Sequence, residues 1–316
     1  MKALFFNEFG SSDVLEYGEL PDPIVCENEL LVEMNYIGLN YADIYRRKGT
    51  YHIEERTPYI NGYEGVGTVV GLGRSVSDYK LGDKVLFVDV PFSNATLVAV
   101  PEENAIRVPD DMDAKLVASI GLQGLTADFL AHDLGNGHEN NNVFVHGISG
   151  GVGQILSQML TADGLNVYGI TSTQEKQRLA LNQGAKKVFL RNSNWEEEYV
   201  SFFDTVYDGV GITLLDSINL LKNKGKVVFF GMAGGNPPSI DFVKLLSQSK
   251  SIVTGDLWDY LSSSQERIKR SNRLFEYFRE GKIQISEPTI FALSKGKEAH
   301  EFLESGKSVG KILLQP

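Results

Sequence analysis

A regular alternation of short apolar strands with helical segments, between residues 142 and 232, constrains the fold more than any other feature of this sequence. The strands are predicted at 142–146, 166–171, 187–190, 205–207 and 226–232, and the helices between them at 153–163, 174–183, 195–203 and 212–221. Repeated strand–helix–strand units of this length are typical of a parallel sheet with helices on both faces. The segment therefore predicts an α/β, doubly wound domain.

The sequence on either side of this segment has a different pattern. Before residue 113, apolar strands alternate with turns rich in Gly, Pro, Asn and Asp, and residues 113–134 have helical spacing. These early strands are predicted at 1–6, 29–36, 65–72, 84–88 and 95–101, and a late helix and strand at 265–280 and 311–314. The simplest arrangement is a nucleotide-type domain, residues 118–267, inserted into a β-rich domain made of residues 1–117 and 268–316.

Composition excludes several classes of protein. The length of 316 residues is that of about two domains, and a single cysteine cannot form an internal disulfide. The net charge of −11 argues against a nucleic-acid partner. No apolar stretch reaches the roughly 18 residues of a membrane span, and the N-terminal apolar run is too short for a signal peptide. We therefore expect a cytoplasmic protein with no membrane partner.

A glycine-rich turn, residues 147–153, follows the first predicted strand and opens the first helix of the alternating segment. Gly150 and Gly151 would let the backbone approach a pyrophosphate, and the amides of Gly151 and Val152 would face that anion at the positive end of the helix. Ile148 stands where the G-x-G-x-x-G pattern has its first glycine. An ordinary tight turn is the alternative, and the flanking strands and helices favour the phosphate-binding one.

The residues after the second strand indicate which dinucleotide the turn would serve. In NAD-preferring sites an acidic residue about 20 positions after the turn binds the ribose hydroxyl. Here the strand 166–171 ends without an acid, and Ser172 and Lys176 follow it. Arg191 comes just after the next strand and is suited to a phosphate. Either cation alone could lie on a solvated surface, but the joint pattern indicates NADP(H).

Two further segments, residues 38–51 and 58–67, together with the nucleotide segment, resemble the medium-chain dehydrogenase/reductase superfamily over nearly the whole chain. Its zinc alcohol dehydrogenases have a cysteine where this chain has Asn40 and a histidine where it has Tyr63. Their four closely spaced cysteines for structural zinc are absent. One cysteine and five scattered histidines provide no set of zinc ligands, so we expect no bound metal.

The zinc-independent quinone oxidoreductase branch is a closer match. That branch shows an Asn, an Asp three residues later and then Arg-x-Gly-x-Tyr, which match Asn40, Asp43, Arg47, Gly49 and Tyr51 here. Its Gly-Leu-Thr-Ala and Gly-Gly-Val-Gly segments match residues 124–127 and 150–153, and its lysine after the second strand matches Lys176. Arg191 is a departure, because a tyrosine is common there.

The resemblance implies a GroES-like, β-rich catalytic domain joined to a Rossmann domain. It implies hydride transfer from NADPH to a quinone or another electron-poor enone without zinc. It also implies that Asn40 and Thr126 lie near the nicotinamide–ribose half of the cofactor, with Gly231 and Met232 beside the ring.

Catalytic candidates follow from the same resemblance. Tyr51 and Tyr45, with Asn40, are the candidates for contacting the acceptor oxygen or relaying a proton, although tyrosines often only pack. Glu64 is expected to be structural or to contact Arg47. Lys311 is expected to be structural.

Two alternatives remain open at this point. The same scaffold could reduce an enoyl thioester or another activated alkene, or it could bind NADPH without catalysis. Residues 251–255 are predicted to form the last strand of the sheet. That strand could pair with its copy in a homodimer.

Overall fold

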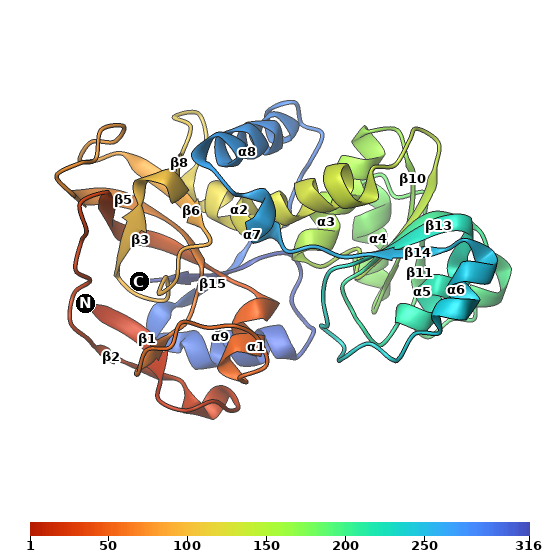
Figure 1. Ribbon diagram of the computed structural model, residues 1–316, viewed down its shortest axis with the longest axis horizontal. Coiled ribbons are helices and arrows are strands. Elements are labelled where there is room, and N and C mark those ends of the chain that lie inside the picture. The colour runs from red at the N-terminus through yellow and green to blue at the C-terminus, as the bar shows by residue number, and fades with distance from the viewer. The chain divides into compact units, whose positions relative to one another are not determined.

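The computed structural model describes all residues, 1–316, and the chain forms two compact units. Unit 1 consists of residues 1–122, 261–271 and 286–316, and unit 2 of residues 123–260 and 272–285. In Figure 1 both ends of the chain, red and dark blue, belong to unit 1, and the green-to-cyan segment belongs to unit 2. The domain limits proposed from the sequence, 117/118 and 267/268, fall within α2 (Ala114–Phe129) and α8 (Ser264–Arg279).

Unit 1 is built mainly of antiparallel strands. Its larger sheet has the order β15-β16-β3-β5-β6-β8, with β7 also paired to β3, and a smaller sheet has the order β2-β1-β4. The strands are β1 (Lys2–Phe6), β2 (Glu16–Glu19), β3 (Glu29–Leu39), β4 (Tyr59–Ile60), β5 (Glu64–Leu72), β6 (Lys84–Val88), β7 (Leu97–Pro101), β8 (Ala105–Arg107), β15 (Thr289–Ala292) and β16 (Ile312–Gln315). Two helices, α1 (Tyr41–Arg47) and α9 (Gly296–Glu304), complete this unit's main elements.

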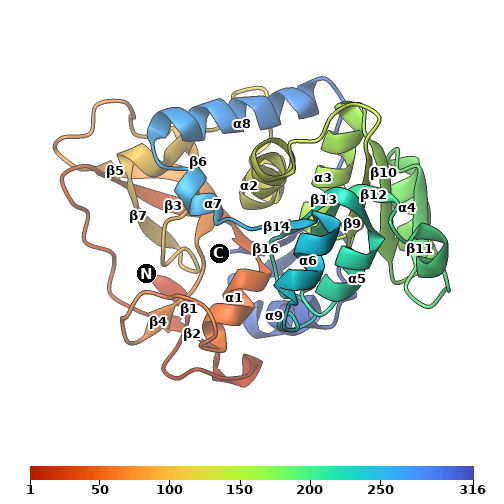
Figure 2. The ribbon, with the colours of Figure 1, turned by 45° about the vertical axis from the view of Figure 1, so that its right-hand side comes forward.

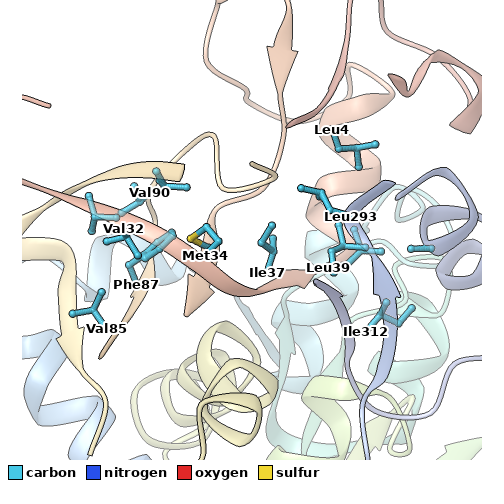
Figure 3. Close-up of a cluster of buried hydrophobic side chains, with 14 of the residues drawn as sticks. Leu4, Val32, Met34, Ile37, Leu39, Val85, Phe87, Val90, Leu293 and Ile312 are labelled. Carbon is cyan, nitrogen blue, oxygen red and sulfur yellow. The ribbon is translucent and has the colours of Figure 1, made fainter. Parts of the chain in front are cut away.

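Strand β3 carries the core of unit 1. Its side chains alternate between buried and more exposed positions as far as Met34, as expected for a strand with one face on a core. Its last residues, from Ile37 to Leu39, are all buried. Figure 3 shows the side chains of β3 gathered with Phe87 of β6 and Ile312 of β16. This packing fixes the point at which β3 ends and α1 begins.

Unit 2 contains a six-stranded parallel sheet with the order β11-β10-β9-β12-β13-β14. Its elements, visible in Figures 1 and 2, are β9 (Asn142–His146), α3 (Gly151–Ala162), β10 (Asn166–Thr171), α4 (Gln174–Asn182), β11 (Lys187–Leu190), β12 (Phe203–Asp208), α5 (Leu214–Leu220), β13 (Leu221–Phe229), α6 (Phe242–Gln248), β14 (Ser251–Val253) and α7 (Leu257–Tyr260). The sequence-based prediction of a doubly wound parallel sheet is confirmed.

The strand order determines where this sheet can bind a ligand. From β9 the chain proceeds outward to β10 and β11, and then returns to place β12 on the other side of β9. Because parallel crossovers are right-handed, α3 and α4 cover one face and α5 and α6 cover the other. The order reverses between β9 and β12. Ligands of doubly wound sheets bind at the carboxyl ends of the strands at such a switch point.

One predicted helix is wrong. Residues 195–203 form only a short 3-10 turn, Glu196–Tyr199, before β12 begins at Phe203. The aromatic side chains at positions 195, 199 and 203 have helical spacing, but they are all buried in one aromatic cluster. The Trp195 ring, for example, stacks on Phe189 with centroids 4.4 Å apart. Packing on the sheet, rather than a helical face, explains the spacing.

Helix α2 continues as a π-helical segment, Leu130–Gly135, which carries a charged cluster inside unit 2. His132 lies between the carboxylates of Asp128 and Asp163, with ring nitrogens 3.2 Å and 3.1 Å from their oxygens. Arg273 of α8 donates two hydrogen bonds to Asp128, of 2.5 Å and 2.6 Å. Burial alone would lower the pKa of His132, but the two carboxylates raise it to about 9. The histidine is therefore charged at neutral pH and joins α2, α3 and α8 within this unit.

No helix of the structure combines the length and the apolar character needed to cross a lipid bilayer.

Candidate functional site

The glycine-rich turn of unit 2 lies between β9 and α3. Gly147 adopts a φ of 63°, in the left-handed region that favours glycine, and its carbonyl accepts a 2.8 Å hydrogen bond from the Gly150 amide. A Cβ at Gly153 would lie 2.2 Å from the Gly147 oxygen, so only glycine permits this close approach. Gly147 thus supplies the tight turn despite Ile148 standing at the first glycine position of the sequence pattern.

Buried polar contacts join the glycine-rich turn to the end of β10 and to α3. The Ser149 hydroxyl lies 2.7 Å from the Thr171 hydroxyl at the end of β10, and the Gln154 side chain donates a 3.0 Å hydrogen bond through Nε2 to the Ser149 carbonyl. Gly150 caps α3, whose first residues are Gly151 and Val152. The first amides of a helix have no partner within it and form its positive end. The turn therefore has the local geometry of a helix N-terminus, with Gly150 at its cap.

The three residues predicted for a 2′-phosphate lie together at the carboxyl ends of β10 and β11. The two strands pair through Thr171 and Leu190, so Ser172 and Arg191 follow at neighbouring positions. Lys176 lies in the first turn of α4, where its amide donates a 3.3 Å hydrogen bond to the capping Thr173 hydroxyl. Burial and the nearby Arg191 guanidinium lower the pKa of the half-buried Lys176. Two like charges held close together favour the binding of an anion.

The other predicted cofactor residues of unit 2 occupy two places. Gly231 and Met232 follow β13 in a loop joined to the loop after β12, since the Ala233 amide donates a 3.1 Å hydrogen bond to the Gly209 carbonyl. Thr126 is half-buried on α2, in the part of that helix that belongs to unit 2.

In unit 1, Asn40 marks the start of α1. Its backbone amide donates a 2.9 Å hydrogen bond to the Asp43 carboxylate, so Asp43 caps the helix. Asp43 is itself buried, and burial raises the pKa of its carboxyl despite nearby Arg46. The Asn61 side chain holds the same turn through a 2.7 Å hydrogen bond to the Asp43 carbonyl. Asp43 therefore holds the backbone of Asn40, and Asn61 holds the helical turn that contains Asp43.

The side chain of Asn40 is held by a buried ion pair. Its Nδ2 donates a 2.7 Å hydrogen bond to Glu64, and its Oδ1 accepts a 3.0 Å hydrogen bond from Lys311. Lys311 also forms an ion pair with Glu64, and both side chains are 1% exposed. The second Glu64 oxygen accepts the Leu122 amide at 2.9 Å. A Cβ at Gly38 would lie 2.0 Å from a Glu64 oxygen, so the strand must approach the carboxylate as glycine.

Tyr45 and Tyr51, the predicted acceptor contacts, lie together in an aromatic cluster around a buried arginine. Their rings meet edge to face with centroids 6.4 Å apart. The Arg46 guanidinium lies 3.7 Å from the Tyr63 centroid and 5.2 Å from the Tyr51 centroid. Arg46 also donates a 3.0 Å hydrogen bond to the His52 carbonyl. The arginine therefore joins α1, which contains Tyr45, to the following loop, which contains Tyr51.

Of the two alternatives expected for Glu64, a structural role or a contact with Arg47, the contact with Arg47 is wrong. Arg47 is fully buried but donates to the Gly10 carbonyl at 3.2 Å and to Glu304 of α9 at 2.9 Å. Its guanidinium also faces His300, and burial together with that charge lowers the pKa of the histidine to about 3. Arg47 therefore joins α1 to α9, and Glu64 pairs with Lys311 instead.

Several residues of these sites were not singled out by sequence reasoning. Arg46 was passed over beside Arg47, and the role of Lys311 toward Asn40 was not foreseen. Neither residue has a local sequence signal. The partner of Lys311, Asn40, is 271 residues away. Only the left-handed turn at Gly147 had one, since a glycine directly after a strand often marks such a conformation.

Two domain families match the chain. The alcohol dehydrogenase GroES-like domain matches residues 26–131, and the zinc-binding dehydrogenase domain matches residues 151–270. The chain therefore belongs to the medium-chain dehydrogenase/reductase superfamily, and the predicted GroES-like plus Rossmann fold class is confirmed. Within that superfamily it belongs to the quinone oxidoreductase branch, as the following relatives show.

Relatives match over nearly the full length. The probable quinone oxidoreductase of Schizosaccharomyces pombe is 34% identical over 318 residues, which cover 96% of this chain and 94% of the relative. The 2-haloacrylate reductase of a Burkholderia species is 30% identical over 296 residues, covering 89% of this chain and 88% of the relative. The crystal structure of Escherichia coli quinone oxidoreductase complexed with NADPH has a TM-score of 0.94 and 28% identity, with 100% of both chains covered.

Proposed function

We propose that this protein is an NADPH-dependent oxidoreductase that transfers a hydride to a quinone or another electron-poor enone, without zinc. The observation that carries the proposal is the pair of cations, Lys176 and Arg191, which follow β10 and β11 at the same edge of the sheet as the glycine-rich turn after β9. The similarity to quinone oxidoreductases, one of them complexed with NADPH, supports the same cofactor and acceptor class.

The residues of unit 2 fit this cofactor. The amides of Gly151 and Val152 bind the pyrophosphate, while Ser172, Lys176 and Arg191 bind the 2′-phosphate. Bound NADPH supplies the hydride. Thr126, Gly231 and Met232 line the nicotinamide side.

The residues of unit 1 fit the acceptor. The Asn40 amide cannot rotate without breaking its bonds to Glu64 and Lys311, so it presents one fixed face. Tyr51 and Tyr45 donate hydrogen bonds to the acceptor oxygen. One of them supplies the proton that the acceptor needs after it receives the hydride. Quinones and enones are already polarised, so orientation and exclusion of water suffice for their reduction.

The chemistry of the zinc positions supports a metal-independent reaction. Asn40 and Tyr63 stand where the zinc alcohol dehydrogenases have a cysteine and a histidine ligand. The Glu64 carboxylate is neutralised by the Lys311 ammonium. The Arg46 guanidinium stacks on Tyr63, which places a second positive charge beside the same segment. No group of three or more His, Cys, Asp and Glu side chains could hold a metal ion. We expect elemental analysis to find no stoichiometric zinc and a chelator to leave turnover unchanged.

An activated-alkene reductase is the second candidate. The similarity to 2-haloacrylate reductase favours it, since that acceptor is also an electron-poor alkene. Both candidates use the same cofactor site and differ in the acceptor.

Turnover with a panel of acceptors tests the proposal. The purified protein is mixed with NADPH and either quinones, simple enones or enoyl thioesters, and consumption of NADPH is followed by absorbance. We expect the highest kcat/KM with a quinone or enone. A higher value with the thioesters would favour the second candidate. Tight NADPH binding without turnover of any acceptor would indicate a non-catalytic binding protein.

We also propose a homodimer formed through β14. This strand is the outermost of the six-stranded sheet, and its outer edge has no neighbour in the chain. An unpaired edge strand can extend the sheet into a second copy. Sedimentation should give a dimer mass for the wild type and a monomer mass for Ile252→Pro.

A further inference from the structure

Two buried polar residues end the neighbouring strands at the switch point of unit 2. His146 is the last residue of β9, and Asp208 is the last residue of β12. Both strands pair in register one position earlier, through Val145 and Tyr207. His146 is 7% exposed and Asp208 is fully buried. Burying two titratable side chains at these positions costs desolvation that apolar side chains would avoid.

Asp208 accepts a hydrogen bond in each of its side-chain contacts. One of its oxygens accepts the amides of Val210 at 2.8 Å and Gly211 at 3.1 Å, and the hydroxyl of Thr213 at 3.0 Å. Its second oxygen accepts the Ser217 hydroxyl at 2.7 Å. Burial alone would raise the pKa of Asp208, but the charge that His146 carries when protonated at acid pH and these hydrogen bonds hold it below the usual value. Asp208 is therefore ionised and can donate nothing.

The proton positions in the hydrogen-bonded series Asp208–Ser217–His146 can be assigned starting from Asp208. Ser217 has one hydroxyl proton, and it is used toward Asp208. The 2.9 Å contact between the Ser217 oxygen and His146 Nε2 must then use the proton on Nε2. Burial lowers the pKa of His146, so its ring is neutral at neutral pH. A neutral ring with a proton on Nε2 has a lone pair on Nδ1, while the hydrogen bond that the ring forms within the chain is at Nε2.

The layout of the sheet indicates which part of a dinucleotide meets this acceptor. The cations for the 2′-phosphate lie at β10 and β11, on one side of β9. The turn after β9 takes the pyrophosphate, and β12 lies on the other side. A group shared by β9 and β12 is therefore on the nicotinamide side. A lone pair repels phosphate oxygens and requires a hydroxyl or amide N–H.

We infer that His146 is a cofactor-binding residue whose Nδ1 accepts a hydrogen bond from the nicotinamide–ribose half of the dinucleotide, with Ser217 and Asp208 as positioning residues that fix its tautomer. This inference rests on the proposed function, since it assumes an NADP(H) site in unit 2. It adds a recognition element for the half of the cofactor that contains the reactive ring.

Binding of a whole cofactor and of its adenosine half tests the inference. His146→Phe keeps an aromatic ring but removes the acceptor, and 2′,5′-ADP contains the 2′-phosphate half only. We expect His146→Phe to weaken NADPH about three- to tenfold, the loss of one hydrogen bond, and to leave 2′,5′-ADP within about twofold. Equal weakening of both ligands, or of neither, would overturn the inference.

The positioning residues have their own test and control. Ser217→Ala leaves the His146 tautomer unfixed, so we expect the same selective loss of NADPH to a smaller extent. Ser157→Ala is the matched control, because Ser157 is also buried but its hydroxyl donates to the Gln154 carbonyl of its own helix. A selective loss in the Ser157 variant, or none in the Ser217 variant, would contradict the positioning role.

The inference and the proposed function fail differently. If the wild-type protein binds neither NADPH nor 2′,5′-ADP, the cofactor assignment itself is wrong. If the wild type binds both and His146→Phe does not discriminate between them, only the role of His146 is wrong.

Discussion

The charged cluster around His132 gives the stability of unit 2 a particular pH dependence. The histidine has a pKa of about 9 in the folded protein, against an ordinary value of 6.5. It therefore binds its proton more tightly when folded, and the resulting stabilisation is complete below about pH 6.5 and lost as the pH rises through about 9. A difference of this size corresponds to about 3 kcal/mol of unfolding free energy.

His132→Gln removes the titrating group and keeps a hydrogen-bonding side chain of similar reach. Urea unfolding of both proteins is measured between about pH 6 and about pH 10, and the difference in unfolding free energy is compared. Other titrating groups cancel in this difference. We expect the wild type to exceed the variant by about 3 kcal/mol at the acid end and to lose that excess at the alkaline end.

A control variant and a clear opposite outcome complete this experiment. His138→Gln changes an exposed histidine in a loop of the same unit and should follow the wild type at every pH. If the excess stability of the wild type over His132→Gln is the same at both ends of the pH range, His132 is not a charged link between the carboxylates. The proposal that a charged His132 joins α2, α3 and α8 would then be wrong.

Three further predictions concern the two sites. Lys311→Met leaves the Glu64 charge buried without its partner, which should lower the unfolding free energy by about 3–5 kcal/mol, and a loss under 1 kcal/mol would contradict the buried pair. Gly153→Ala places a Cβ 2.2 Å from the Gly147 oxygen, so it should abolish NADPH binding in a titration, while unchanged affinity would show that the turn is not so constrained. Tyr51→Phe removes only a hydroxyl and should lower kcat about tenfold or more at unchanged NADPH affinity, whereas an unchanged kcat would exclude Tyr51 as the proton donor.

The parts of the fold that sequence predicted are those with local signals. The alternation of strands and helices, the glycines at 150, 151 and 153, and the cations after β10 and β11 all depend on neighbours within a few residues. The positions of these glycines and cations follow directly once a parallel sheet forms, because the carboxyl ends of all its strands lie at one edge. The same local reasoning misread residues 195–203, where aromatic spacing reflects burial on the sheet.

The parts that could not be predicted depend on contacts between distant residues. Asn40 and Lys311 are brought together only when β16 pairs with β3. His146 and Ser217 meet only when β9 and β12 become neighbours, 71 positions apart in the sequence. Arg46 and Arg47 are adjacent and chemically alike, so the sequence does not indicate which of them meets Asp43 or Glu304. The pairing of buried charges is decided by topology, not by local pattern.

The discrimination between NADPH and NADH tests the proposed cofactor site most directly. The dissociation constants of both are measured for the wild type, for Lys176→Ala with Arg191→Ala together, and for Lys187→Ala, a control lysine at the start of β11. The double variant should bind NADPH about 10- to 100-fold more weakly, as expected for lost charge-assisted bonds to a phosphate, while NADH and the control change by less than about twofold. Equal weakening of both cofactors in the double variant would show that the two cations do not recognise the 2′-phosphate.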